Sequence, residues 1–530
     1  MRTRRSFKGG WQFFAAAALV GACLSASAPG PRAAAGLAQA PEGPRAAVAP
    51  KRPQKAAFAP ETVGIDLGRA VEVALPKPGG DLQPAAFKTA DGREGWVVRI
   101  PGGRPLATPA YSDGRLFVGG GYGSHEFYAF DAKTGRMVWK TNTGDDGPSG
   151  AVVEDGLVAF NTESCTLVVV DEKTGKLVWQ EWLGDPLMSQ PAVSKGRLYM
   201  AYPKGQRGGQ HRGRVMRRAT RQEPRAQEEE EEGSHRLLCA DLRTGEHVWE
   251  RAISADVISA PVVSDGKVYA TTFDGTSYSF DAATGERVWK RENAGTSAPT
   301  VVAGALVVTQ KEERDGKAYE AVHRLDARRG VATARDPLAR GEAGYLDRDK
   351  GGGVAIRQEA QASLDSSVGF SNAPAAAQLH RANDHLGVRT VVGGWAYQGS
   401  RAAYSKGRML NAQGRYLNSV NASDGRFVWR AEVSGGGLAE GAQVFSPPAL
   451  GEEFIYLSSA LGHLLAVGQG DGRVGFMYRF PEPMVFQLAL AEGGVYVGTS
   501  NGLLICLKTG SSDADGWYAW GGNGEHNKNR

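Results

Sequence analysis

The chain has 530 residues, 72 of them glycine, and a formal net charge of +5. Apolar residues make up 41% of it, enough for a packed protein, and the small net charge argues against a dedicated nucleic-acid binder. Four cysteines are too few for a disulfide scaffold. The length alone suggests about three domains, unless the chain is a repeat array that extends one fold unit by unit.

Residues 1–22 have the pattern of an export signal. A basic start is followed by an apolar stretch from Trp11 to Val20, which is too short to span a bilayer as a stable anchor. The stretch ends in the letters LVGAC, which resemble a bacterial lipobox with Cys23 as the residue to be acylated. We therefore expect a signal peptide over 1–22 and a lipid anchor on Cys23.

The residue after the lipobox bears on location. Leu24 stands where an aspartate would favour retention in the inner membrane, so we expect attachment to the outer membrane, facing the periplasm. The alternative is ordinary cleavage after Ala28 or Ala35, which would give a soluble periplasmic or secreted protein. Residues 23–88 are rich in alanine and proline and show no hydrophobic period, which predicts an extended, disordered tether.

The body of the chain repeats one phrase. It reads DAKTGRMVW from Asp131 to Trp139, and close copies run from Asp171 to Trp179, Asp241 to Trp249 and Asp281 to Trp289. Weaker copies run from Asp326 to Gly330, from Asn421 to Trp429 and from Gly472 to Phe476, and half-copies run from Gly92 to Trp96 and from Lys508 to Gly510. With Ala334 taken as a missing tryptophan, the marks define eight units of about 40–47 residues, two of them swollen. This period is typical of a β-propeller.

Each unit predicts a four-stranded antiparallel blade. The Asp-x-x-Thr-Gly segment has the chemistry of a tight hairpin, because Asp and Thr bind nearby amides and Gly accepts the left-handed conformation. The hairpin residues of the four close copies are Asp131, Gly135, Asp171, Gly175, Asp241, Gly245, Asp281 and Gly285. We expect the tryptophan of each unit to pack into the adjoining blade. These blade-docking residues are Trp96, Trp139, Trp179, Trp249, Trp289 and Trp429.

The repeated phrase resembles the PQQ-like (quinoprotein-type) propeller family over about residues 89–523. The resemblance implies an all-β, eight-bladed propeller. One branch of the family comprises dehydrogenases that bind pyrroloquinoline quinone (PQQ) and calcium. The other branch is non-enzymatic and includes the BamB-type lipoproteins of the outer-membrane β-barrel assembly machinery, which share the signal peptide, lipobox, tether and propeller seen here.

The cysteines and motifs favour the non-enzymatic branch. The dehydrogenases commonly carry two adjacent cysteines over the cofactor, whereas Cys165, Cys239 and Cys506 are far apart. No haem-attachment, zinc, Walker or dinucleotide motif occurs. The sequence therefore identifies no catalytic, cofactor-binding or metal-binding residue, and none is carried over from the family.

Two insertions, about 203–234 and 336–388, interrupt the repeat. The first contains eight basic residues and a run of acids from Glu228 to Glu232, which predicts a solvated loop or an electrostatic contact. In the second, a weak calcium-loop pattern lacks its bidentate glutamate, and His380 and His385 have no third ligand.

The chain ends with an aromatic run, Gly516–Asn523, that we expect to cap a face or help close the ring, followed by a tail over 524–530. The predicted function is a monomeric, non-catalytic scaffold that binds other envelope proteins, including barrel-assembly factors. The alternatives are a divergent PQQ-dependent oxidoreductase and a ligand-sensing or polysaccharide-binding propeller.

Overall fold

The structure is a computed structural model that describes residues 62–121, 123–163, 166–184, 189–204, 233–293, 295–334, 337–343, 397–438 and 443–527. These residues form eight sheets, and each sheet contains four strands that pair antiparallel with their neighbours. Blade 1 comprises β5 (Ala110–Ser112), β6 (Arg115–Gly119), β7 (Glu126–Asp131) and β8 (Met137–Asn142). Blade 2 comprises β9 (Val152–Glu154), β10 (Leu157–Asn161), β11 (Thr166–Asp171) and β12 (Leu177–Trp182).

The next three blades follow in chain order. Blade 3 comprises β13 (Ala192–Ser194), β14 (Arg197–Pro203), β15 (His235–Asp241) and β16 (His247–Ile253). Blade 4 comprises β17 (Val262–Ser264), β18 (Lys267–Thr271), β19 (Ser277–Asp281) and β20 (Arg287–Arg291). Blade 5 comprises β21 (Thr300–Val302), β22 (Ala305–Arg314), β23 (Lys317–Asp326) and β24 (Ala339–Glu342).

The last three blades have five strands, because segments near the N-terminus join them. Blade 6 comprises β25 (Ala403–Ser405), β26 (Arg408–Gln413), β27 (Tyr416–Asn421), β28 (Phe427–Ser434) and β1 (Thr62–Asp66). Blade 7 comprises β29 (Ala449–Leu450), β30 (Phe454–Ser458), β31 (His463–Gly468), β32 (Val474–Arg479) and β2 (Val71–Glu72). Blade 8 comprises β33 (Ala489–Ala491), β34 (Gly494–Gly498), β35 (Leu503–Lys508), β4 (Glu94–Arg99) and β3 (Ala85–Lys88).

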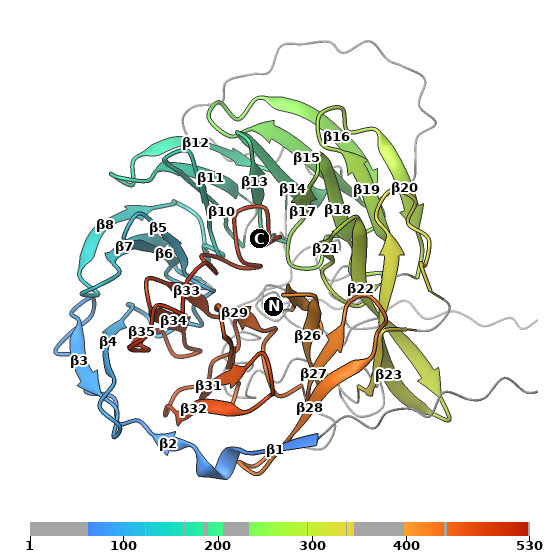
Figure 1. Ribbon diagram of the computed structural model, residues 1–530. Coiled ribbons are helices and arrows are strands. Elements are labelled where there is room, and N and C mark those ends of the chain that lie inside the picture. The colour runs from blue at the N-terminus through green and yellow to red at the C-terminus, as the bar shows by residue number, and fades with distance from the viewer. Residues whose placement is uncertain are drawn as a thin grey trace, which may run out of the picture. The chain divides into compact units, whose positions relative to one another are not determined.

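The blades form a closed ring (Figure 1). Each innermost strand, from β5 to β33, contacts the innermost strand of the next blade, and the contact of β33 with β5 completes the circle. Blade 8 is built from both ends of the propeller, since β35 pairs antiparallel with β4, from Leu503 opposite Arg99 to Leu507 opposite Gly95. The predicted eight-bladed, all-β propeller is thereby confirmed.

Two backbone features recur inside the blades, and the first of them accounts for several of the glycines. In seven blades the first hairpin has positive φ at both central residues, as in Asp155 (52°) and Gly156 (74°), which is what a type I′ turn requires. In six blades the register shifts by one residue just before the aromatic position, so that Val178, for example, is an extra residue between Leu177 and Trp179. Such bulges twist the outermost strand.

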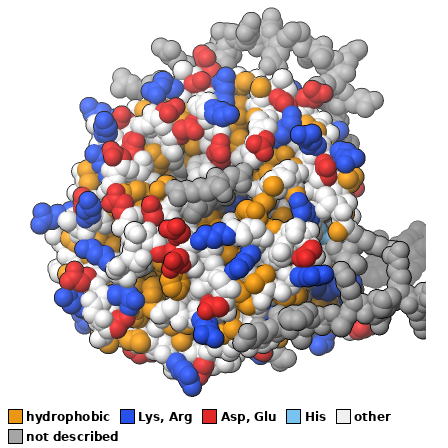
Figure 2. Space-filling view, viewed as in Figure 1, with side chains coloured by type: hydrophobic (Ala, Val, Ile, Leu, Met, Phe, Trp, Pro, Cys, Tyr) orange, Lys and Arg blue, Asp and Glu red, His pale blue; other side chains and the backbone are white. Residues whose placement is uncertain are grey.

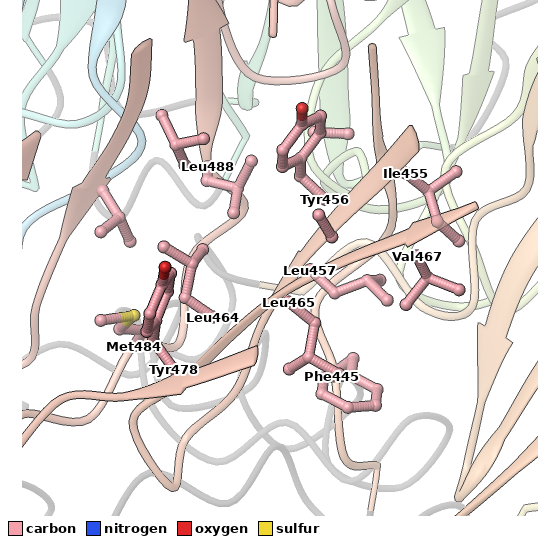
Figure 3. Packing of buried hydrophobic residues seen from close by; sticks show 14 of the residues in the cluster. Phe445, Ile455, Tyr456, Leu457, Leu464, Leu465, Val467, Tyr478, Met484 and Leu488 are labelled. Atoms are coloured by element: carbon pink, nitrogen blue, oxygen red, sulfur yellow. The ribbon is translucent and has the colours of Figure 1, made fainter. Parts of the chain in front are cut away.

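The core lies between the blades because both faces of each sheet are covered. All five residues of β10 are buried, as are the first five residues of β11, which accounts for their unbroken apolar sequence. Figure 3 shows the same packing in blade 7, where Tyr456 and Leu457 of β30 lie near Leu464 and Leu465 of β31.

The tether boundary at residue 88 is wrong. Residues 62–66 lie parallel to the outer strand β28, residues 71–72 lie parallel to β32, and residues 85–88 pair with β4. A 3-10 turn, η1 (Leu67–Arg69), joins the first two strands. Ile65 and Leu67 are 1% exposed. The partners of residues 62–66 and 71–72 lie in blades far along the chain, so no local pattern marks these two strands.

Other predicted segments fare differently. The tail was expected to begin at residue 524, but His526 and Asn527 are buried against the propeller, so that boundary is also wrong. The signal peptide, Cys23 with the tether as far as residue 61, and most of both insertions lie outside the described residues. Lys204 N donates to Ser234 O over 2.9 Å, so the described residues at the two ends of the first insertion are hydrogen-bonded to each other.

Candidate functional site

The tryptophan and glycine of the repeat meet across six of the eight seams between blades. The indole of Trp139 in blade 1 lies over Gly175 of blade 2, where an added Cβ would lie 2.5 Å from the ring. Its Nε1 donates to the Glu172 carbonyl over 3.0 Å. The same pairing joins Trp96 to Gly135, Trp179 to Gly245, Trp249 to Gly285, Trp289 to Gly330 and Trp429 to Gly472.

The hairpin aspartates organise the loop that receives the indole. Asp131 Oδ1 accepts hydrogen bonds from Thr134 N at 2.8 Å and Thr134 Oγ1 at 2.7 Å. Asp171, Asp241 and Asp281 make the equivalent bonds to Thr174, Thr244 and Thr284. A hydrogen bond from Lys267 and bonds from the hairpin amides lower the pKa of Asp281 to about 2. These carboxylates therefore stabilise the hairpin turns.

Two seams depart from this pattern. Ala334 was taken as the missing tryptophan of blade 5, and this is wrong, because Leu338 packs on Gly425 of blade 6, with Cδ2 3.1 Å from the position of an added Cβ. At the seam between blades 7 and 8, a Cβ added to Gly510 would have no described heavy atom within 4 Å. There Arg93 lies over the ring of Phe476 at 4.9 Å, and its Nη1 bonds to the hydroxyl of Tyr478.

The end of the chain occupies the axis of the ring. Residues 513–527, here the C-terminal segment, run along the innermost strands of several blades, and Figure 1 shows the C-terminus near the centre. The segment carbonyls of Trp517, Tyr518, Gly524 and Glu525 accept from the backbone amides of Leu490, Tyr111, Val193 and Val263. Trp520 is 1% exposed and its Nε1 donates to Ser259 Oγ. The expected capping run is thus placed inside the ring.

A buried polar cluster lies beside this segment. Arg401 is 6% exposed, and burial lowers its pKa to about 10. Its guanidinium donates to Thr300 Oγ1 at 3.3 Å, to Gln398 Oε1 at 3.2 Å and to the His526 carbonyl. The cavity next to it measures about 10 Å³, room for roughly one water molecule. A tricyclic quinone therefore does not fit among the described residues at this point of the axis.

Next come the thiol groups and the candidate metal ligands of the described residues. Cys239 and Cys506 are buried in strands β15 and β35, and desolvation raises their pKa values to about 11 and about 12. Within the described ranges, no group of three or more His, Cys, Asp or Glu side chains is placed to hold a metal ion. Among those same residues, no helix has the length and apolarity to cross a membrane.

The accessible surface is mixed in charge. Figure 2 shows acidic and basic side chains interspersed over the face seen in Figure 1. Apolar exposure recurs at the residues before the repeat tryptophan, where Val138 is 45%, Leu177 50% and Val178 41% exposed. These outer-strand positions of blades 1 and 2 are features that the sequence analysis did not single out, although the same Val-Trp phrase encodes them.

Comparison with known proteins agrees with the architecture. The family model described as outer membrane protein assembly factor BamB matches residues 80–232, 231–359 and 365–521. The protein of that name from Bordetella pertussis (strain Tohama I) is 26% identical over 299 residues, which are 51% of this chain and 77% of that protein. The one from Burkholderia pseudomallei (strain K96243) is 25% identical over 289 residues, or 48% and 74% of the two chains.

A solved structure extends the comparison to the fold alone. The computationally designed Ika8 protein superposes with a TM-score of 0.50 and 14% identity, covering 77% of this chain and 98% of that one. The three segments of the family model take in most of the propeller. This chain therefore belongs to the family described as outer membrane protein assembly factor BamB.

Proposed function

We propose that this protein is a non-catalytic scaffold of the cell envelope that takes part in the assembly of outer-membrane β-barrel proteins by binding other components of the assembly machinery. The observation that carries the proposal is the family match across the propeller, together with relatives named as assembly factors. The protein acts as a monomeric propeller held at the outer membrane by a lipid on Cys23.

The arrangement at the axis supports binding over catalysis. The chain's own C-terminal segment lies along the innermost strands, and the described space beside Arg401 is about 10 Å³. Partners then meet loops, outer strands and seams, which are the parts of a propeller that repeat around the ring. Extended polypeptide segments suit such surfaces because strand edges offer backbone hydrogen bonds.

Crosslinking in intact cells tests the proposal. A photoreactive amino acid at Leu177, which is half exposed on an outer strand, is irradiated and the products are identified by mass spectrometry. Recovery of the barrel-assembly core protein is expected. A probe at Leu198, which is fully buried, serves as the matched control and should give no product. A different dominant partner, with the core protein absent, would contradict the proposal.

The oxidoreductase alternative has its own direct test. Purified protein is titrated with PQQ and calcium, and dye reduction is followed with an alcohol or aldose as electron donor. We expect neither stoichiometric binding nor reduction, because the cavity beside Arg401 measures only about 10 Å³ and cannot hold the quinone. Saturable one-to-one binding with turnover would replace the scaffold with an enzyme.

The anchor is tested separately. Cys23→Ala should move the protein from the membrane fraction to the soluble fraction and abolish labelling by a clickable fatty acid, because a stable anchor needs its acyl chains. Val20→Leu, which moves the lipobox closer to consensus, should preserve both. Membrane retention of Cys23→Ala with undiminished label would mean that Cys23 is not the acylated residue.

A further inference from the structure

Arg401 is a buried positive charge beside the axis of the ring. Only 6% of the residue is exposed, and its pKa of about 10 leaves the guanidinium charged at neutral pH. Taking an isolated charge out of water costs far more free energy than burying a neutral polar group, so buried charges in proteins are ordinarily paired. A matching negative charge is therefore expected close to this side chain.

The groups that contact the guanidinium are all neutral. They are the Thr300 hydroxyl, the Gln398 side-chain carbonyl and the backbone carbonyl of His526. Burial, together with the charge on Arg401, lowers the pKa of His526 to about 4, so that imidazole is neutral as well. Among the residues that the structure describes, no aspartate or glutamate forms an ion pair with Arg401, and burial is the cause of its lowered pKa. The described contacts therefore leave its charge uncompensated.

A relay of amide groups holds the guanidinium in place. Gln398 Nε2 donates to Gln487 Oε1 over 3.1 Å, which leaves Gln398 Oε1 to accept from Arg401. Gln487 Nε2 donates in turn to the carbonyls of Pro447 and Pro448, over 3.2 Å and 3.1 Å. Each terminal nitrogen of Arg401 also carries a second N–H group, which has no acceptor within the described part of the chain. Two donors at a fixed guanidinium thus remain for a ligand.

The same guanidinium lines a small cavity. The cavity measures about 10 Å³ and lies between the innermost strands β21, β25 and β29 and the C-terminal segment. That volume accommodates one particle of about the size of a water molecule. Much of the wall is apolar, with Ala402, Pro447 and Leu450 among the lining residues, and no described acidic residue lines it. A space of single-ion size therefore lies against the buried charge.

We propose that this cavity binds one chloride ion, which neutralises Arg401. A guanidinium donates charge-assisted hydrogen bonds to an anion. Carboxylates and phosphates contain several heavy atoms and do not fit in about 10 Å³, whereas chloride is only slightly larger than a water molecule. Water would fill the space but would leave the charge uncompensated. This anion site goes beyond the scaffold role and does not depend on it.

The bound ion would also help to hold the C-terminal segment in the ring. Arg401 belongs to the chain just before β25, and it donates to the carbonyl of His526 in that segment. An anion that compensates the guanidinium removes the cost of burying it there. Chloride should therefore bind the folded chain and not the unfolded one, in which Arg401 is hydrated.

Urea unfolding of the full chain measures this linkage. The titrations are run at constant ionic strength while chloride is replaced by gluconate, which is too large for the cavity. A ligand that binds only the folded state lowers the apparent unfolding equilibrium constant in proportion to its concentration once the site is filled. We expect that constant to fall about tenfold for each tenfold rise in chloride above the dissociation constant.

Three variants assign the linkage to the site. Arg401→Gln removes the charge and should abolish the chloride dependence. Arg401→Lys keeps the charge with fewer donors, so the dependence should begin at higher chloride. Arg136→Gln removes an exposed arginine outside the cavity and should behave as the wild type does.

Diffraction gives a reading that needs no variant. Crystals of the wild-type protein grown in sodium chloride, measured at a wavelength long enough for chlorine to scatter anomalously, should show a peak in contact with the guanidinium of Arg401. Absence of that peak at molar chloride would overturn the proposal, also where Arg401→Gln does not fold. An equal dependence on gluconate, or an undiminished chloride dependence in Arg401→Gln, would overturn it as well.

Discussion

At the scale of single residues, the repeat glycine satisfies two requirements at once. Gly175 has a φ of 68°, which side-chain-bearing residues rarely adopt, and the indole of Trp139 from the preceding blade lies against it. The backbone requirement was visible in the sequence as Asp-x-x-Thr-Gly. The contact was visible only as a constant spacing of four residues between Gly and Trp in each unit, which does not say that the glycine meets a different unit's tryptophan.

The two requirements can be separated by mutation. Gly156→Ala, at a φ of 74° with nothing within 4 Å, should cost about 1 kcal/mol of unfolding free energy from backbone strain alone. Gly175→Ala should cost at least about 2 kcal/mol more, because its Cβ would collide with the Trp139 ring. Denaturant titration followed by circular dichroism measures both.

A double mutant identifies the source of the extra cost. In the Trp139→Ala background the collision is gone, so Gly175→Ala should cost no more than Gly156→Ala does. Additive losses in the double mutant would show that the indole does not cause the penalty.

His247 of blade 3 pairs with Glu181 of blade 2 across the seam and with Glu250 of its own blade. Burial lowers its pKa, but hydrogen bonds to Glu181 Oε2 at 2.7 Å and Glu250 Oε1 at 2.6 Å outweigh burial and raise the pKa to about 9. Since an unfolded histidine titrates near 6.5, the folded state holds its proton more tightly, and this stabilisation is complete below pH 6.5.

The expected consequence is a loss of about 1–3 kcal/mol of stability as pH rises from 6.5 through 9. Unfolding free energies measured across this range should show the decline, and His247→Gln should flatten it. A slope of the same size in His247→Gln would assign the effect to other groups.

At the scale of elements, backbone hydrogen bonds join the C-terminal segment to the ring. It hydrogen-bonds innermost strands of blades 8, 1, 3 and 4, and buries Trp517 and Trp520. Sequence reasoning found the aromatic run but ended it at Asn523. The remaining contacts, such as His526 Nε2 with the Pro191 carbonyl at 2.8 Å, join residues with no shared motif and could not be read locally.

Ending the chain at Asp515 should therefore lower stability by at least about 3 kcal/mol, because it removes two buried indoles and several backbone hydrogen bonds. Ending it at Asn527 removes only three residues beyond the described contacts and is the control. Scanning calorimetry of the two chains measures the difference. A shortened chain that melts with the control would mean that the axis segment is not needed for stability.

The outer edge shows the same limit of local reading. Thr62–Asp66 alternates in burial, with Ile65 inside, yet it lies within an alanine- and proline-rich stretch, and its partners on β28 are more than 350 residues away. The four core strands of blades 1 to 7, by contrast, pair with sequence neighbours, which is why repeat spacing alone predicted four-stranded sheets.

At the scale of the whole molecule, closure makes the blades interdependent. An open repeat array can lose units one at a time, whereas here every innermost strand has a neighbour on both sides. We expect tryptophan fluorescence and far-ultraviolet circular dichroism to report one coincident unfolding midpoint for the intact chain.

A chain that begins at Gly103 lacks β4 and leaves β35 without its antiparallel partner. Its two spectroscopic transitions should separate or broaden, because blade 8 loses the contact of Trp96 with Gly135 of blade 1 and that of Arg93 with Phe476 of blade 7. Coincident, equally sharp transitions in that chain would show that cooperativity does not depend on closure.

The shared blade also sets the timing of folding. Trp96 and the rest of β4 come early in the chain, but their partner strand ends at Lys508, so the ring cannot close before the ribosome has made nearly the whole polypeptide. Until then one edge of β4 has no partner strand, and residues that are buried in the closed ring, such as Val97 and Val98, lie on it. A prematurely terminated product would keep that edge exposed, and proteases and chaperones that bind unfolded chains could recognise it.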